Sequence, residues 1–533
     1  MQLIVSAGVI AAIVLWGLIS PATLGSVFNR ALADISHNFG WLYLWLVLLL
    51  VVLAVFLAVT RYGNLKLGDH DDEPEFSLPA WFSMLFAAGM GIGLVFYGVA
   101  EPISHYVTPP PGVEPLTAEA ARTSMRYAFF HWGLHPWAVY GVVGLAIAFF
   151  SFRRKTTPLI SSVTESLPWA IARKLSPAFN VLAIVATAFG VAASLGVGAT
   201  QINGGLHAAF GVTVSATNQA IIIVVTTVLF ITSAVTGVER GVKYLSMGNL
   251  LVAALLALFV LVVGPTVAIV DTLTNTLGSY LSQLVQMSLR TTPFRDNTWV
   301  ADWTVFYWAW WLAWSPFVGL FIARVSKGRT IREFIMGVVL APSLVGFVWF
   351  SIFGGTALNL EIFRDVPLAE AVKENVATTM FVMFNALPAS TLLSIVATVL
   401  VFVFFVTSGD SATLVLGTMS TGGDPNPKAK VKIIWGVLVS GIAMSLLLAG
   451  GINALQAATI VFALPFSLVL ILMCIALVIA IRQDWREEDA QERKLHRRLR
   501  EWVSKEEAVG QGAGGGQAPS SARPAQARRD DIG

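Results

Sequence analysis

Charged residues and cysteine are both scarce in this chain. Asp, Glu, Lys and Arg make up only 12% of its 533 residues, whereas about 25% is typical of soluble globular domains. Hydrophobic residues reach 56%, and the mean hydropathy is +0.74. This composition excludes a soluble globule and indicates a protein that crosses a membrane many times. The single cysteine, Cys474, lies in the last apolar run, so a disulfide framework and a cysteine metal cluster are excluded as well.

Long apolar runs divide the chain into membrane-spanning segments. A spanning helix needs about 20 predominantly apolar residues, and the sequence predicts an all-α polytopic protein with twelve of them. They fall at about residues 3–20, 42–60, 81–100, 127–152, 180–208, 218–236, 246–271, 303–323, 334–357, 389–417, 433–450 and 457–481. The first run lacks a basic leading region and a small-residue cleavage site, so we expect it to be retained rather than removed as a signal peptide.

Basic residues are distributed unevenly between the connections of these spans. The even-numbered connections carry sixteen Lys and Arg, the odd-numbered ones carry seven, and the remaining eleven of the 34 follow Ile481. Because positively charged loops remain on the cytoplasmic side, the bias predicts that both termini lie in the cytoplasm.

Two segments lie outside the spans. Residues 276–289 place Leu277, Leu281 and Leu284 among polar residues, which predicts an amphipathic helix on the outer surface, with an ordinary loop as the alternative. Residues 486–507 carry equal numbers of acidic and basic side chains and predict a charged cytoplasmic helix. From Val509 onward, Gly, Ala, Ser, Pro and Gln predominate, so we expect disorder there.

The stretch WTVFYWAWWLAWSPFVG, residues 303–319, contains five tryptophans and a tyrosine within twelve residues. Indole faces are the best side-chain partners for a cation that cannot donate hydrogen bonds, which favours a quaternary ammonium site. The alternative is an interfacial aromatic belt, but belts cluster at the ends of spans, and this cluster runs through successive turns. We expect Ser315-Pro316 to break the helix and to free backbone carbonyls.

Three glycines at alternate positions mark residues 87–93, AAGMGIG. Each glycine costs a helix about 1 kcal/mol relative to alanine, so we expect an unwound segment whose carbonyls can bind Na⁺ and whose amides meet an anionic group. The alternative is close helix packing, because Gly89 and Gly93 also form a GxxxG pair.

Two further clusters carry polar or aromatic groups at bilayer depth. In HWGLHPWAVY, residues 131–140, the spacing of His131 and His135 resembles a metal-binding helix, but no third ligand is in view, and helix packing is the favoured reading. In FFVTSGDS, residues 404–411, the hydroxyls of Thr407 and Ser408 are oxygen ligands suited to Na⁺. Hydrogen bonding of these hydroxyls to their own helix is the alternative.

The motifs AAGMGIGLVFYGVAEP (87–102), HWGLHPWAVY (131–140), WTVFYWAWWLAWSPFVGLFIARVSKGRTIREF (303–334) and FFVTSGDSA (404–412) together resemble the betaine/carnitine/choline transporter family. The resemblance covers about residues 1–482. It implies a core of two inverted five-helix repeats, formed by spans 3–7 and 8–12, and a homotrimer braced by the amphipathic helix. The division is then 1–80, 81–274, 275–300, 301–482 and 483–533.

The resemblance also implies roles for particular residues. The ammonium box would consist of Trp132, Trp137, Tyr140 and Trp311. Trp310 and Trp314 would line the inward path, and Gly89, Met90, Gly91 and Gly93 would meet the substrate's anionic end. One sodium site would use Ala87, Met90, Phe404, Thr407 and Ser408. A second would include Thr187 and Phe317, but Val191 stands where sodium-coupled members carry a second threonine.

We therefore expect a symporter that imports a betaine-type zwitterion together with Na⁺ and uses no further cofactor. Sodium-independent exchangers of the family carry an Arg in span 5 and a Met after the Ser-Pro-Phe of span 8. This chain has no Lys or Arg between Lys174 and Arg240, and it has Val318. The alternative is proton-coupled uptake of choline, or of carnitine, ectoine or dimethylsulfoniopropionate. An enzyme, a channel and a nucleic-acid partner are not expected, and the partners are the substrate, lipid and further copies of the chain. We expect no acidic residue at the box.

Overall fold

The computed structural model describes residues 1–89, 91–237, 239–294 and 298–513. The chain forms two compact units, Met1–Val478 and Ile479–Gly533. The described residues contain no strand beyond one isolated bridge between Lys66 and Thr330, so the fold is all-helical as predicted.

Ten stretches of helix in the described part are long and apolar enough to cross a membrane. The helices are α1 (Gln2–Ile19), α2 (Pro21–Val59), α3 (Leu78–Gly89), α4 (Ile92–Val107), α5 (Ala118–Trp132), α6 (Leu134–Ala148), α7 (Ile160–Glu165), α8 (Ala170–Phe210), α9 (Ala216–Thr236), α10 (Glu239–Val263), α11 (Thr266–Ser288), α12 (Phe306–Arg324), α13 (Ile331–Arg364), α14 (Leu368–Glu374), α15 (Thr379–Asn385), α16 (Ser390–Ser420) and α17 (Ala429–Ala513). Single π-helical turns, Phe149–Arg153 and Ala301–Val305, follow α6 and precede α12.

The difference between ten stretches and twelve predicted spans has a local cause at two places. The run 81–100 is divided between α3 and α4, and neither half reaches spanning length. The runs 433–450 and 457–481 lie in one long element, α17, which is bent at Gly450 and Gly451. Gly451 has φ +65° and ψ −144°, a conformation that side-chain-bearing residues rarely adopt, so a glycine is needed at this bend.

Three predicted boundaries are wrong. Residues 21–41, expected as a connection, are helical and continue into the second span as one helix, α2. The run 246–271 is interrupted after Val263, because Pro265 cannot continue that helix; Pro265 is the N-cap of α11, which begins at Thr266. The charged helix 486–507 is present as predicted, but residues 509–513, for which disorder was expected, are also helical.

The centre of the first unit is built from helices that pack at short range. Helix α12 packs on α6 and α8, and α13 covers α4, α5 and α6. Where α6 crosses α12, a Cβ on Gly319 would lie 3.0 Å from the Gly144 nitrogen and 2.8 Å from Val143 Cγ1. The two backbones therefore meet at a pair of glycines, which brings the aromatic side chains of both helices into one layer.

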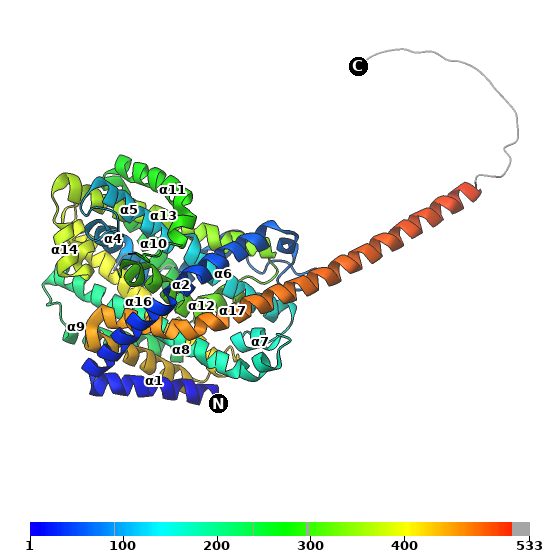
Figure 1. Cartoon of the computed structure of the whole chain (residues 1–533), viewed down its shortest axis with the longest axis horizontal. Coiled ribbons are helices and arrows are strands. Elements are labelled where there is room, and N and C mark those ends of the chain that lie inside the picture. Colours follow the sequence, from blue (N-terminus) through cyan, green and yellow to red (C-terminus); the bar gives the residue numbers. More distant parts are fainter. Residues whose placement is uncertain (90, 238, 295–297, 514–533) are drawn as a thin grey trace, which may run out of the picture. The chain divides into compact units, whose positions relative to one another are not determined.

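Helix α11 lies along α5 and α13 at the margin of the first unit (Figure 1). It is the helix predicted at 276–289, although it begins ten residues earlier, at Thr266. Tyr280 is fully buried and accepts a hydrogen bond from the Leu134 N–H. Leu281 and Val285 are 56% and 62% exposed, so much of the apolar face points away from the protein.

Two loops are joined by backbone hydrogen bonds near the first turns of α3 and α13. Leu67 donates to the Arg329 carbonyl at 2.8 Å, Gly328 donates to the Leu67 carbonyl at 2.9 Å, and Ile331 donates to the Leu65 carbonyl at 2.9 Å. The Arg329 guanidinium lies 4.1 Å from the centre of the Trp81 ring on α3. We call this contact between residues 65–67 and 328–331 the loop clasp.

Candidate functional site

The site begins where the helix of the third apolar run is interrupted. Helix α3 ends at Gly89, α4 begins at Ile92, and Gly91 between them has φ −150° and ψ −148°. The interruption that the glycine pattern predicts is confirmed at Gly91, whereas Met90 lies outside the described residues. The first N–H groups of α4 lack helical partners, and such an N-terminus attracts anions.

The four box residues are brought together from three helices. The Trp132 ring lies 4.9 Å from that of Trp311, Trp311 lies 6.1 Å from Tyr140, and Tyr140 lies 5.6 Å from Trp137, each pair nearly perpendicular. Trp132 ends α5, Trp137 and Tyr140 belong to α6, and Trp311 belongs to α12. All four are at least 90% buried, so these rings form one continuous aromatic cluster rather than an interfacial belt.

Trp310 adjoins this cluster, and Trp314 lies one turn further along α12. The rings of Trp310 and Trp311 stack at 5.1 Å with an angle of 8° between their planes. The Trp310 indole donates to Ser194 Oγ at 3.2 Å, and the Trp311 indole donates to the His131 carbonyl at 3.0 Å. Trp314 is partly exposed and contacts Phe317 edge to face at 5.2 Å.

Gly93 connects the helix interruption to the aromatic cluster. A Cβ at this position would lie 2.9 Å from Trp132 Cη2 and 3.1 Å from Trp310 Cη2. Glycine therefore lets the first turn of α4 touch two aromatic walls, and the helix N-terminus and the rings border the same space.

The expected break at Ser315-Pro316 is wrong, because α12 continues through it to Arg324. Proline removes the N–H that would bind the Leu312 carbonyl four residues earlier. The Ser315 hydroxyl takes its place by donating to that carbonyl at 2.7 Å. The freed carbonyl is thereby satisfied within the helix.

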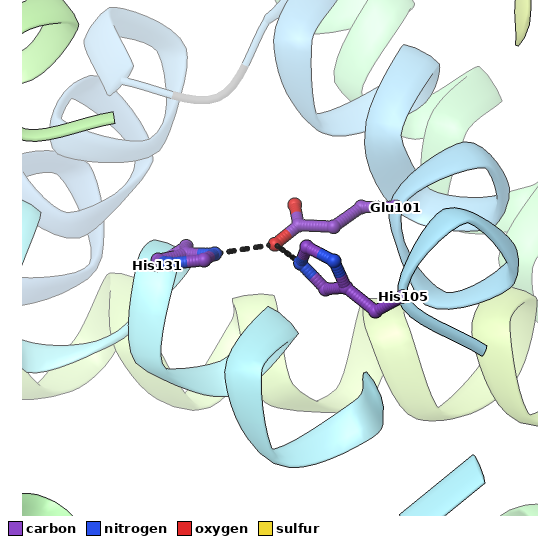
Figure 2. Close-up of side chains that lie close together, drawn as sticks. All are labelled: Glu101, His105 and His131. Atoms are coloured by element: carbon purple, nitrogen blue, oxygen red, sulfur yellow. Dashed lines mark hydrogen bonds and ion pairs between the residues drawn. The ribbon is translucent and has the colours of Figure 1, made fainter. Parts of the chain in front are cut away.

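The expectation of no acidic residue at the box is also wrong. Glu101 on α4 is fully buried, and its Oε2 accepts hydrogen bonds from Trp132 Nε1 at 2.7 Å and from the Tyr307 hydroxyl at 2.5 Å. Its Oε1 lies 2.7 Å from His131 Nδ1 and 3.2 Å from His105 Nε2 (Figure 2). The carboxylate thus stands directly behind a wall of the box.

The sequence contains a signal for Glu101 that motif reading missed. Gly93, Tyr97, Glu101 and His105 follow one another at intervals of four residues, so they lie along one face of α4. Gly93 marks the start of this face at the aromatic rings. A carboxylate two turns further along the same face is therefore directed at the same region.

The side chains of His131 and His135 do not converge on a common point where a metal ion could bind both. His131 lies between Glu101 and Thr304, with 3.0 Å from its Nε2 to Thr304 Oγ1. His135 Nε2 lies 2.8 Å from Ser288 Oγ on α11, and its ring stacks on Trp308. Both histidines therefore pack and form hydrogen bonds between helices, as the sequence analysis favours.

The candidate residues for the first sodium site lie on α3, α16 and the segment between α3 and α4. The Thr407 hydroxyl bonds to its own helix, as the alternative expects, by donating to the Val403 carbonyl at 3.0 Å. Its oxygen lone pairs remain available as acceptors. Phe404 and Thr407 are buried, and Ser408 is partly exposed. Ala87 belongs to the last turn of α3. The start of α4 reaches this region, because Ile92 and Phe405 both lie against Gly198 of α8.

The candidate residues for a second site lie where α8 packs on α12. The Thr187 hydroxyl is buried and has no hydrogen-bond partner among the described residues. Phe317 is 6% exposed. One turn from Thr187, a Cβ on Gly190 would lie 2.8 Å from Trp314 Cδ1, which brings the two helices close at this level. Val191 is buried and offers no oxygen ligand.

Comparison with known proteins identifies similar chains over almost the whole length. A family profile described as betaine/carnitine/choline family transporter (BCCT) matches residues 2–486. The glycine betaine transporter OpuD of Bacillus subtilis is 48% identical over 90% of this chain and 93% of its own. The ectoine/hydroxyectoine transporter of Virgibacillus pantothenticus is 44% identical over 88% of this chain and 94% of its own. Glycine betaine transporter 1 of Vibrio parahaemolyticus is 40% identical over 90% and 93%, respectively.

Proposed function

Because this chain belongs to the betaine/carnitine/choline family of membrane transporters, and so is a transporter and not an enzyme, we propose that it imports a betaine-type zwitterion, with glycine betaine as the first candidate. The proposal rests on the cluster of Trp132, Trp137, Tyr140 and Trp311. Three indoles and a phenol buried together offer π faces to a cation, each worth about 0.5–2 kcal/mol. A methylated ammonium suits such a site because it has no N–H to satisfy.

The interruption of α3 and α4 supports the zwitterion rather than a bare cation. The N-terminus of α4 provides backbone N–H groups for a carboxylate, and Gly93 brings this end of the helix against the rings of the box. Gly89, Met90 and Gly91 are the remaining residues that we assign to the anionic end. A substrate that carries both charges a few atoms apart would satisfy both halves of the site.

We further propose that Na⁺ drives uptake through a site formed by Ala87, Met90, Phe404, Thr407 and Ser408. Back-bonded Thr407 keeps oxygen lone pairs available, and hard cations take oxygen ligands. The unpartnered hydroxyl of Thr187, on the helix that packs against the helix of Phe317, supports a second ion there, and Val191 makes that second site poorer in oxygen.

The proposed architecture has twelve spans, with the α3–α4 pair counted as one and α17 counted as two up to Ile481. Two inverted five-helix repeats, cytoplasmic termini in a bacterial inner membrane and a homotrimer braced by α11 complete this proposal. Transport would then proceed by alternating access around the box at the middle of the membrane.

Uptake of labelled glycine betaine into proteoliposomes tests the function. We expect accumulation with an inward Na⁺ gradient at constant pH, and collapse of uptake when K⁺ replaces Na⁺. A pH gradient alone should drive none. Full accumulation on a pH gradient without Na⁺ would favour the proton-coupled alternative, and efficient choline uptake would favour choline over the zwitterion.

A further inference from the structure

Glu101 is fully buried and has hydrogen-bonding partners on both carboxylate oxygens. Four groups surround its carboxylate, and the two on Oε2 are the Trp132 indole and the Tyr307 hydroxyl. An indole N–H can only donate, so Glu101 Oε2 must act as an acceptor there. Glu101, His105 and His131 are all fully buried, and the nitrogen and oxygen atoms of this group lie within 4.8 Å of one another.

The two Oε2 donors are also part of the aromatic cluster. The Tyr307 ring stacks on Trp311 at 5.8 Å, and Trp132 meets Trp311 at 4.9 Å. Both rings therefore present a face or an edge to the box while their polar ends hold the same carboxylate oxygen. Hydrogen bonds in a low-dielectric interior polarise the groups that make them. A carboxylate acceptor shifts electron density toward the rings that donate to it.

We propose that Glu101 is the buried counter-charge of the ammonium site, and that it selects a cationic head group by acting through Trp132 and Tyr307. It is a positioning residue, because its oxygens are held by these side chains rather than exposed to the box. The negative charge strengthens the attraction between the rings and a cation in a region of low dielectric. This inference rests on the proposed function and deepens it.

The direction of α4 supports the assignment. The helix offers its positive N-terminal end near Gly91 and carries a negative charge at Glu101, separated by ten residues or about 15 Å of helix axis. A zwitterion aligned with its carboxylate at the N-terminus and its ammonium at the box matches this order of charges. A neutral head group of the same shape gains nothing from Glu101.

The test compares two ligands that differ in one atom. Glycine betaine carries a trimethylammonium, and 3,3-dimethylbutanoate carries a tert-butyl group on the same carboxylate frame. Kd values for both are measured with the purified full-length protein at saturating Na⁺, the first directly by tryptophan fluorescence and the second by competition. We expect Glu101→Gln to weaken glycine betaine at least about fivefold and to leave 3,3-dimethylbutanoate unchanged or tighter.

Two matched variants separate charge from structure. Glu101→Asp keeps the charge, so we expect it to preserve the wild-type preference for the ammonium over the tert-butyl ligand even where both bind more weakly. Glu361→Gln removes a carboxylate that accepts from the Leu368 and Ala369 backbone N–H groups, and we expect both Kd values to remain at wild-type levels. An equal loss for both ligands in Glu101→Gln would overturn the inference and reduce Glu101 to a structural role.

If Glu101→Gln does not fold, Tyr307→Phe replaces it. This variant removes one donor from Oε2 and keeps the ring, so we expect a loss of about two- to threefold for glycine betaine alone. Equal changes for both ligands, or none, would overturn the inference. Failure of the wild type to bind glycine betaine would instead contradict the proposed function, which keeps the two results distinct.

Discussion

The helices at the centre of the first unit differ from those at its periphery in a way that hydropathy alone would misjudge. In the α5–α6 stretch Ala118–Arg153, 94% of the residues in the apolar 18-residue segment are buried inside the protein, and in Ala301–Arg324 the share is 83%. In Ala216–Thr236 and Tyr244–Val263 the values are 28% and 22%, although these two stretches are the more hydrophobic. Among these four stretches the two less hydrophobic ones are the more enclosed, and Ala170–Phe210, which is as hydrophobic as Ala216–Thr236 but 89% buried, shows that hydropathy does not set burial.

The cause of this inversion is what each helix contacts. Peripheral α9 and α10 expose aliphatic side chains such as Val228 and Leu251, which are suited to contact with the hydrocarbon chains of lipid. The central helices carry indoles, imidazoles and Glu101, which are expensive in lipid and need protein partners. The four candidate box residues thus lie in the two spans that look most marginal as membrane segments.

We expect the largest effect where Gly144 of α6 meets Gly319 of α12 at the centre of the unit. Gly319→Leu should prevent correct packing, because even its Cβ would lie 2.8 Å from Val143 Cγ1, and overpacking of this kind costs about 1–3 kcal/mol or more. We expect loss of monodisperse protein in size-exclusion chromatography. Gly8→Leu on α1, where no atom lies within 4 Å of the Cβ position, should behave like the wild type. Equal behaviour of the two variants would remove the distinction between centre and periphery.

The next effect separates central from peripheral tryptophans. Trp311→Ala should raise the half-saturating concentration of glycine betaine about tenfold or more, since a desolvated cation–π contact is worth about 1–2 kcal/mol or more. Trp45→Ala on α2, where the side chain is 49% exposed, should leave uptake kinetics unchanged. Uptake assays on both variants decide this, and a Trp311→Ala protein that folds and transports normally would contradict the box.

A smaller effect concerns the choice between zwitterion and cation at Gly93. We expect the wild type to handle choline poorly and Gly93→Asp to shift the uptake ratio toward choline, because an added carboxylate repels the substrate's own and attracts a bare cation. Any side chain here must displace the Trp132 and Trp310 rings, so total uptake should fall as well. Gly93→Ala isolates that steric part and should lower uptake without changing the ratio. Efficient choline uptake by the wild type would show that this stretch is wrongly assigned.

The smallest effect is expected at the periphery. The hydroxyl oxygens of Thr227 on α9 and Ser440 on α17 lie 2.6 Å apart. Hydrogen bonds between membrane helices are worth about 0.6 kcal/mol on average, so Thr227→Val should lower the thermal unfolding temperature in detergent only slightly and leave uptake intact. A loss of many degrees would mean that peripheral contacts carry as much stability as the centre.

The sequence was sufficient for features that depend on local chemistry. Apolar runs predict where helices lie, and alternating glycines predict the interruption at Gly91, because both depend on residues that are neighbours in the chain. The assembly of Trp132, Trp137, Tyr140 and Trp311 into one cluster agrees with the resemblance to known transporters. Their role in binding stays a prediction.

Features that depend on distant partners were missed. The spacing from Gly93 places Glu101 on the face of α4 that points to the box, but its hydrogen bonds come from Trp132, Tyr307 and His131 on other helices, which the sequence does not place beside it. Likewise, nothing local shows that the Ser315 hydroxyl would satisfy the carbonyl freed by Pro316 and keep α12 continuous.

The loop clasp has a consequence for how the box can communicate with the side of the membrane where α12 ends. Three backbone hydrogen bonds connect residues 65–67 to residues 328–331, next to the cation–π contact between Arg329 and Trp81. Each bond contributes about 0.5–1.5 kcal/mol, so separating α3 from α12 here would break several of them at once. We therefore expect the loop clasp to stay intact during the transport cycle. The exit would then open between α8 and α12, where Trp314 lies partly exposed against Gly190.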